Sequence, residues 1–168
     1  MPWHGADGVL ITGVYGSGKS AVAAEITYLL EQRNQRYALL DLDYLGWVGD
    51  HAMGHRMMLR NLAAVAPNYR DAGIAVFVVA YFLRDLGALR SVREALGVPL
   101  RVVRLSVPWP EIQRRLASDV TSGRGDDLRD AASSIAEGEG VGVEDVVINN
   151  DRAVGIVARE VMSWLGWL

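Results

Sequence analysis

Eight residues, Gly13-Val-Tyr-Gly-Ser-Gly-Lys19-Ser20, constrain this chain more than any other stretch, because their spacing needs a strand before it and a helix after it. The preceding residues 9–12 form a short apolar run, and apolar residues recur at helical spacing over residues 20–32. Both flanks are therefore present, and the pattern predicts a phosphate-binding loop at a helix N-terminus.

The residue types in this loop predict its chemistry. Backbone N–H groups of such a loop converge on the phosphates, the lysine reaches the β- and γ-phosphates, and the serine after it ligates Mg²⁺. We therefore expect ATP and Mg²⁺ as cofactors, with Lys19 catalytic and Ser20 a metal ligand. The loop residues predicted to contact the nucleotide are Gly13, Tyr15, Gly16, Ser17, Gly18, Lys19, Ser20 and Ala21.

Lysine usage supports the same interpretation. Lys19 is the only lysine among the 17 Lys and Arg residues of the chain. A composition that replaces lysine with arginine should spare only a position that needs a compact ammonium on a flexible stem. The alternative, an ordinary glycine-rich turn, does not account for this lysine or for the two flanks.

Composition excludes several classes of function. The 168 residues predict a single domain over residues 1–168, and a net charge of -3 without a basic run argues against a nucleic-acid partner. The chain has no cysteine, which excludes disulfides, thiolate metal sites and cysteine nucleophiles. No signal-peptide pattern begins the chain, and the longest apolar run, residues 74–82, cannot span a bilayer. We expect a cytoplasmic protein without a membrane partner.

Strand-like apolar runs alternate with helical patterns along the chain. Such alternation predicts an α/β protein, a three-layer P-loop fold with a parallel sheet of about five strands and helices on both faces. Residues 118–142 are polar and glycine-rich, and we predict a lid there with one short helix. Besides 9–12, the predicted strands are 37–42, 74–80, 100–106 and 145–148, and the later helices are 53–66, ended by Pro67, then 86–96, one from about 111, and 152–164.

Other residues narrow the class of P-loop protein. Asp43-Tyr-Leu-Gly46 matches the D-x-x-G of GTPases, but no Asn-Lys-x-Asp motif follows, and Asn149-Asn-Asp151 lacks the lysine. Transport ATPases need a longer chain and a carboxylate at the end of the strand 74–80, where Tyr81 and Phe82 stand instead. Two classes remain, a small-molecule kinase and a nucleotide-operated binding module.

Several segments resemble adenylylsulfate kinase and its relatives among the nucleoside-monophosphate-kinase-like P-loop kinases. The resemblance implies transfer of the γ-phosphoryl group of ATP to a hydroxyl of a small-molecule acceptor. The chain departs from the family at Leu42, where the family has glycine, in lacking Ser-Pro before Tyr81, and in its lid, so the acceptor is not carried over. The similar segments are Leu40-Asp-Leu-Asp43, residues 59–66, Arg70-Asp-Ala-Gly73, residues 80–85 followed by Arg90 and Arg93, and residues 146–151.

Two aspartates at the end of the predicted strand 37–42 are the candidate acid–base and metal residues. The carboxyl ends of parallel strands form the ligand crevice in such folds, so Asp43 is predicted to orient and deprotonate the acceptor hydroxyl. Asp41 is predicted to hold Mg²⁺ through water. The alternative is that one or both cap the loop leading to the next helix.

Arginines and one tyrosine are candidates for binding the acceptor. Arg56, Arg60, Tyr81 and Arg84 belong to segments that should meet at the crevice, and arginine suits an anionic acceptor. The alternative is that each arginine is a solvated helix residue. His51 and His55 are predicted to be loop or surface residues.

The remaining candidates belong to the lid and the base-binding wall. The resemblance places Arg115 against adenine, with Asn150 on the opposing wall, and Arg124 is predicted to close over the phosphates as a catalytic arginine. The alternative for Arg114 and Arg115 is an exposed helix face. The apolar tail, residues 164–168, is predicted to pack on the core, with a homodimer contact as the alternative.

Overall fold

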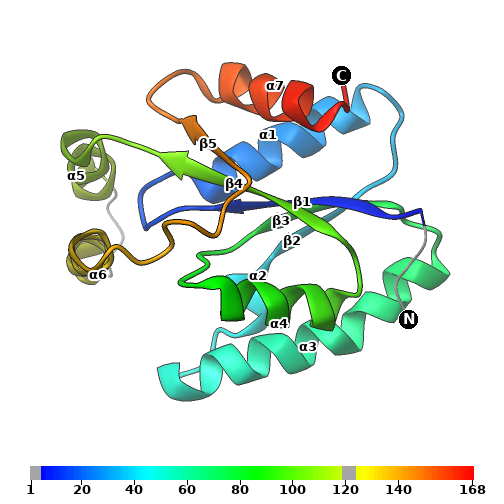
Figure 1. Ribbon diagram of the computed structural model, residues 1–168, viewed down its shortest axis with the longest axis horizontal. Helices are drawn as coiled ribbons and strands as arrows, with labels where there is room; N and C mark the ends of the chain where they lie inside the picture. Colours follow the sequence, from blue (N-terminus) through cyan, green and yellow to red (C-terminus); the bar gives the residue numbers. More distant parts are fainter. Residues whose placement is uncertain (1–4, 119–123) are drawn as a thin grey trace.

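The computed structural model describes residues 5–118 and 124–168, which form one five-stranded parallel sheet (Figure 1). The strand order is β2-β3-β1-β4-β5, so β1, which leads into the P-loop, is the central strand. This confirms the predicted α/β class and the five strands. The strands are β1 (Asp7–Thr12), β2 (Ala38–Asp41), β3 (Val76–Ala80), β4 (Leu100–Ser106) and β5 (Val146–Asn149).

Helices cover both faces of the sheet (Figure 1). On one face lie α1 (Lys19–Glu31) and α7 (Val154–Leu165), and on the other lie α3 (His51–Asp71) and α4 (Leu86–Leu96). Because successive strand residues point to opposite faces, Val9 and Ile11 of β1 join the first core while Leu10 joins the second. A strand buried on both faces needs a continuous apolar run, which is what residues 9–11 supply.

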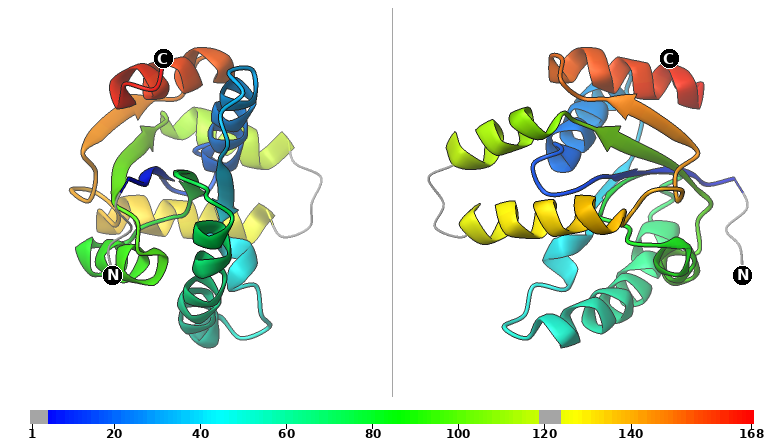
Figure 2. Two further views of the ribbon diagram at one scale, coloured as in Figure 1. Left: turned by 90° about the vertical axis from the view of Figure 1, so that its right-hand side faces the viewer. Right: turned by 60° about the vertical axis from the view of Figure 1, so that its left-hand side comes forward.

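Two further helices pack beyond the carboxyl ends of the strands. α5 (Trp109–Ser118) and α6 (Arg124–Glu137) lie side by side there (Figure 2). Ala131 of α6 is fully buried in a small cluster with Ile112 and Leu116 of α5. The single-turn helix α2 (Leu42–Leu45) follows β2 directly.

The structure corrects the predicted end of the helix 53–66. α3 continues through Pro67 to Asp71. Proline removes one backbone hydrogen bond and costs about 3 kcal/mol in a helix interior. Packing opposes this cost, because Ala66 is buried and the Tyr69 ring meets the Phe77 ring edge-on at 6.0 Å.

The predicted lid also differs from the prediction. α6 is a helix of 14 residues instead of a short one, because Leu128 and Ala131, three residues apart, pack against α5. Residues 119–123, which the lid prediction included, lie outside the described residues. None of the described helices is long and apolar enough to span a membrane.

The apolar tail has mixed surroundings. Leu165 is buried in the core between the sheet and α7, and the indole N–H of Trp167 donates to Asp7 at 2.9 Å. Trp164 is partly exposed and lies 5.8 Å from the Arg101 guanidinium, and Leu168 is exposed. Packing of the tail on the core is thus observed for part of it.

Candidate active site

The P-loop connects β1 to α1 and depends on three glycines with positive φ. Gly13, Gly16 and Gly18 have φ of 150°, 82° and 91°. A Cβ at Gly13 would lie 2.5 Å from the Ser17 hydroxyl, and one at Gly18 would lie 2.5 Å from the Asn150 amide nitrogen. Both backbone conformation and lack of space therefore require glycine in this loop.

Lys19 is held inside the loop. Its ammonium donates to the carbonyl oxygens of Gly13 at 2.8 Å and Val14 at 3.3 Å, and 9% of the residue is exposed. Burial lowers the pKa of Lys19 to about 8, and the negative charges of Asp43 and Asp41 oppose that shift. Desolvation therefore outweighs these charges, and a bound phosphate would add negative charge that favours the ammonium form.

The loop also contains an unsatisfied polar group. The Ser17 hydroxyl is fully buried and has no hydrogen-bond partner among the described residues. Tyr15 is partly exposed beside the Lys19 ammonium, which lies 5.5 Å from the ring centroid, and Ala21 is exposed in the first turn of α1. An unsatisfied buried donor in a loop of this conformation fits a phosphate group.

The side-chain oxygens of Ser20, in the first turn of α1, and of Asp41, at the end of β2, lie next to each other. The Ser20 hydroxyl donates to the Asp41 carboxylate at 2.7 Å. The other oxygen of Asp41 accepts from the Asp43 backbone N–H at 3.3 Å, so Asp41 also caps α2. The described residues include no group of three or more Asp, Glu, His or Cys that could together hold a metal ion. Two protein oxygens suit Mg²⁺, which usually keeps several waters and takes the rest of its ligands from phosphates.

Asp43 stands in the first turn of α2. Burial raises the pKa of its carboxyl, the charge of Asp41 raises it further, and the charge of Lys19 opposes both. A carboxylate with a raised pKa is a better proton acceptor once ionised. Asp43 also lines a cavity, so one carboxylate belongs to the cavity wall and interacts electrostatically with Lys19 of the P-loop.

The cavity has a volume of about 600 Å³. Of the residues predicted to bind the acceptor, Asp43, Tyr81 and Arg84 line it. Its walls come from the α2–α3 segment and from the segment that joins β3 to α4, and the lining residues are Leu42, Asp43, Gly46, Val48, His51, Ala52, Gly54, His55, Met58, Tyr81, Phe82, Arg84, Asp85, Gly87, Ala88 and Ser91.

The structure places Arg56 and Arg60 away from this cavity. Both are exposed, and neither is among the lining residues. His55 and Met58 of the same helix do line the cavity. The side chains that α3 contributes to the described lining therefore include no arginine.

His51 and His55, which were predicted to be loop or surface residues, are exposed and also line the cavity. His55 Nδ1 lies 3.1 Å from the Tyr81 hydroxyl, and the two rings stack at 6.5 Å between centroids. Burial, followed by the charge of Asp43, raises the pKa of Tyr81. The signal that could have found them is the spacing of His51, His55 and Met58 at i, i+4 and i+7, which puts all three on one helix face.

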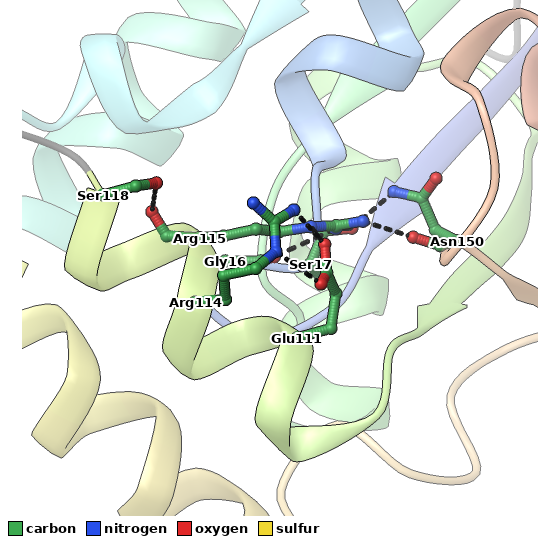
Figure 3. A network of polar contacts seen from close by, with 7 residues as sticks. All are labelled: Gly16, Ser17, Glu111, Arg114, Arg115, Ser118 and Asn150. Atoms are coloured by element: carbon green, nitrogen blue, oxygen red, sulfur yellow. Dashed lines mark hydrogen bonds and ion pairs between the residues drawn. The ribbon is translucent and has the colours of Figure 1, made fainter.

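Arg115 ties the P-loop to α5 and to the end of β5 (Figure 3). Its guanidinium donates to Gly16 O at 3.2 Å, to Asn150 O at 2.6 Å and to the Glu111 carboxylate at 2.9 Å. The side-chain amide of Asn150, which is buried, donates to Ser17 O at 2.7 Å. Hydrogen bonds to Arg114 and then to Arg115 lower the pKa of Glu111 to about 2. We call Glu111, Arg115 and Asn150 the P-loop bracket.

The bracket bears on the predicted contact with adenine. The hydrogen bonds of Arg115 use the edges of its guanidinium, whereas stacking on a base would use the flat face. Stacking of Arg115 on adenine stays a prediction. Arg124 is the first residue of α6, and the placement of its side chain lies outside what the structure describes.

α6 brings a carboxylate that sequence analysis did not consider. Besides the larger effects described above, the charge of Asp127 raises the pKa values of Lys19 and Asp43. Asp127 is therefore near both residues, and the surroundings of the P-loop lysine are rich in carboxylates.

Comparisons with known proteins agree with this fold. No protein-family model matches the chain, and a search of curated proteins finds no match. A solved sugar kinase from Janibacter sp. is 18% identical with a TM-score of 0.71, over 96% of this chain and 95% of that one. The shikimate kinase of Acinetobacter baumannii, in complex with shikimate, is 18% identical with a TM-score of 0.60, over 95% and 93%.

A third solved structure belongs to the group that the sequence resembles. The adenylylsulfate (APS) kinase of Mycobacterium tuberculosis, in complex with AMPPNP and APS, is 21% identical with a TM-score of 0.63, over 96% of this chain and 98% of that one. The chain therefore has the fold of P-loop small-molecule kinases, which confirms the resemblance at the level of fold.

Proposed function

We propose that this protein is an ATP- and Mg²⁺-dependent kinase that transfers the γ-phosphoryl group of ATP to a hydroxyl of a small molecule. The observation that carries the proposal is the position of Asp43. This residue lines the cavity of about 600 Å³, and its negative charge also raises the pKa of the buried Lys19 of the P-loop. A kinase needs an acceptor site next to the phosphate site with a carboxylate between them. The kinases with this fold support the same class of reaction.

Each residue of the nucleotide half has a role in this proposal. The P-loop amides and Lys19 bind the phosphates, and Ser20 with Asp41 holds Mg²⁺, which would neutralise charge on the β- and γ-phosphates. Arg115 stacks on adenine opposite Asn150. Residues 118–142 act as a lid of the single domain 1–168, with Arg124 as the residue that reaches the phosphates.

The acceptor half supplies the proton acceptor. Asp43 hydrogen-bonds the acceptor hydroxyl and takes its proton as the oxygen attacks the γ-phosphorus in line with the leaving ADP. Tyr81 and Arg84, which line the same cavity, bind the body of the acceptor. The lack of cysteine fits action in the reducing cytoplasm.

A second candidate is a nucleotide-operated binding module that has no acceptor. The observation in its favour is that β3 ends at Ala80 and runs into Tyr81 without a carboxylate, so the usual Walker B acid is missing. The acceptor cavity and the kinase folds of the matched structures favour the first candidate.

Acceptor-stimulated ATP consumption separates the two. We would measure ATP turnover alone and with pools of hydroxylated metabolites, and follow AMPPNP binding by the melting temperature. A ligand at about a hundred times its dissociation constant adds roughly 2.7 kcal/mol to the stability of the folded state. A kinase should be stimulated by at least one pool, whereas normal AMPPNP binding without stimulation by any hydroxylated pool would favour the binding module.

A further inference from the structure

The acceptor cavity has an unusual charge for a kinase site that would hold an anion. Among its lining residues are two carboxylates, Asp43 and Asp85, and one arginine, Arg84. The side chain of Arg84 is 70% exposed and its guanidinium lies 3.8 Å from the Glu139 carboxylate. The one arginine of the described lining is thus partly neutralised and faces solvent.

Among the described lining residues, no arginine or lysine besides Arg84 balances the carboxylates of the cavity. Asp85 accepts from the Ala88 backbone N–H at 2.8 Å and caps α4, which compensates it in part. Asp43 has Asp41 and Asp127 as further negative neighbours and Lys19 as its positive one. Lys19 is committed to the phosphates in the proposed reaction, so it is not available to an anionic acceptor.

α3 contributes no arginine to the described lining of the cavity. α3 turns His51, His55 and Met58 into the cavity and leaves Arg56 and Arg60 exposed elsewhere. The other described lining side chains are apolar, as at Val48 and Phe82, or carry hydroxyl groups, as at Tyr81 and Ser91. Hydroxyl and imidazole groups can each donate and accept, which suits an alcohol.

We propose that the acceptor of this protein is an uncharged hydroxyl compound, and that the cavity discriminates against carboxylates, sulfates and phosphates at the acceptor. The inference rests on the proposed kinase function and sharpens it. The physical reason is that an anion placed beside Asp43 would meet like charge in a partly buried site, with Arg84 as the one opposing lining residue that is always positively charged. It replaces the expectation of an anionic acceptor, which depended on Arg56, Arg60 and Arg84, because only Arg84 is among the described lining residues.

A first experiment tests the cavity without knowing the acceptor. With the nucleotide site filled by AMPPNP and Mg²⁺, inorganic sulfate is titrated into the full chain and followed by calorimetry. We expect no saturable sulfate binding to the wild type. Ser91→Arg, which adds a cation to the lining, serves as the positive control and should bind sulfate saturably. Saturable binding by the wild type that Arg84→Gln abolishes would overturn the inference.

A second experiment uses pairs of acceptors that differ in charge. Shikimate is compared with its methyl ester, and gluconate with glucitol, by ATP consumption and by the melting shift in the presence of AMPPNP. We expect the uncharged member of any active pair to be preferred by about tenfold or more, since like charges brought together in one site lower affinity by at least that factor. Preference for the charged member would overturn the inference and leave the kinase proposal standing.

The two failures are distinguishable. If AMPPNP binds normally but no member of either pair, nor any pool of hydroxylated compounds, stimulates ATP consumption, the kinase proposal fails. The sulfate titration then still decides whether the cavity rejects anions, because it does not depend on turnover.

Discussion

The two halves of the site are held in different ways. On the nucleotide side, the carbonyl oxygens of Gly13, Gly16 and Ser17 each accept a hydrogen bond from the side chain of Lys19, Arg115 or Asn150. On the acceptor side, the walls meet through the contact between His55 and Tyr81, and several wall residues are exposed. Nucleotide phosphates have one shape, so a rigid preformed loop suits them. The acceptor half is open, and the side chains that the fold turns into the cavity determine its chemistry.

One part of the acceptor side is tightly packed, the segment 46–50 that joins α2 to α3. A Cβ at Gly46 would lie 2.4 Å from Gly54 O, so the backbone of this segment packs directly on α3. The neighbouring Tyr44 and Trp47 rings stack at 5.7 Å and are largely exposed. The backbone of the acceptor side is therefore fixed while its side chains are accessible.

Loss of Asp43 should have the largest effect and should fall on the acceptor half alone. Asp43→Asn keeps the shape of the residue but removes the proton acceptor, so we expect transfer to slow by about 10² to 10⁴ with little change in ATP affinity. Transfer is followed by a coupled assay and ATP binding by calorimetry. The matched variant Asp41→Asn should instead weaken the Mg²⁺ dependence of ATP binding, because Asp41 contacts Ser20. Full transfer activity in Asp43→Asn would refute the base assignment.

The same carboxylate predicts a pH dependence. The pKa of Asp43 is raised, by burial first and then by Asp41, so the carboxyl takes up a proton at a higher pH than an ordinary aspartate. The protonated form cannot accept a proton from the acceptor, and kcat should fall as the pH drops through this raised value. A wild-type acid limb at the ordinary pKa of aspartate, or one that Asp43→Asn retains, would contradict the assignment.

Loss of Lys19 should affect both halves through the phosphates. Lys19→Ala should fold, since a partly desolvated ammonium gives little to the core, but should lose about 10² to 10³ in turnover and the stabilisation by nucleotide. Lys19→Met is the matched variant that keeps the length of the side chain. Circular dichroism checks folding, and melting with and without Mg·AMPPNP checks binding. Wild-type turnover in either variant would remove the central claim about the P-loop.

Loosening the P-loop bracket should have an intermediate effect on the nucleotide half. Asn150→Ala removes the shorter of the two hydrogen bonds to Ser17 O and leaves the one from Arg115 at 3.4 Å, which costs roughly 0.5–1.5 kcal/mol and should weaken Mg·ATP binding by about threefold to tenfold. Asn149→Ala changes the exposed neighbour and is the control. Equal ATP affinity in the two variants, measured by calorimetry, would show that the bracket does not support the loop.

The smallest expected effect is proton uptake when Mg·ATP binds. Because the pKa of Lys19 in the free protein is about 8, the ammonium is partly deprotonated near that pH, and phosphate charge should raise its pKa again. Binding of Mg·ATP near pH 8 should therefore take up a fraction of a proton, seen by calorimetry in buffers of different ionisation enthalpy. Lys19→Met should show no such uptake. Proton release in the wild type would contradict the buried, depressed lysine.

The sequence by itself determined the P-loop, its lysine and the class of fold. The loop is a local pattern in which glycine positions, Lys19 and Ser20 follow one another at fixed spacing, and the strands are local apolar runs, so short-range rules were sufficient. Asp41 and Asp43 could be placed at the site for the same reason, because they follow β2 directly.

Only the tertiary structure decided which side chains share the acceptor cavity. His55 and Arg56 are adjacent in sequence, yet α3 turns one toward Tyr81 and the other toward solvent, and that choice depends on how α3 packs on the sheet. The contact of Arg115 with Gly16 joins residues 99 positions apart in the chain. The persistence of α3 through Pro67 and the length of α6 depend on packing against other elements, β3 and α5. Local periodicity specifies that a helix has faces, but packing free energy, which is summed over distant segments, selects the face that meets the site.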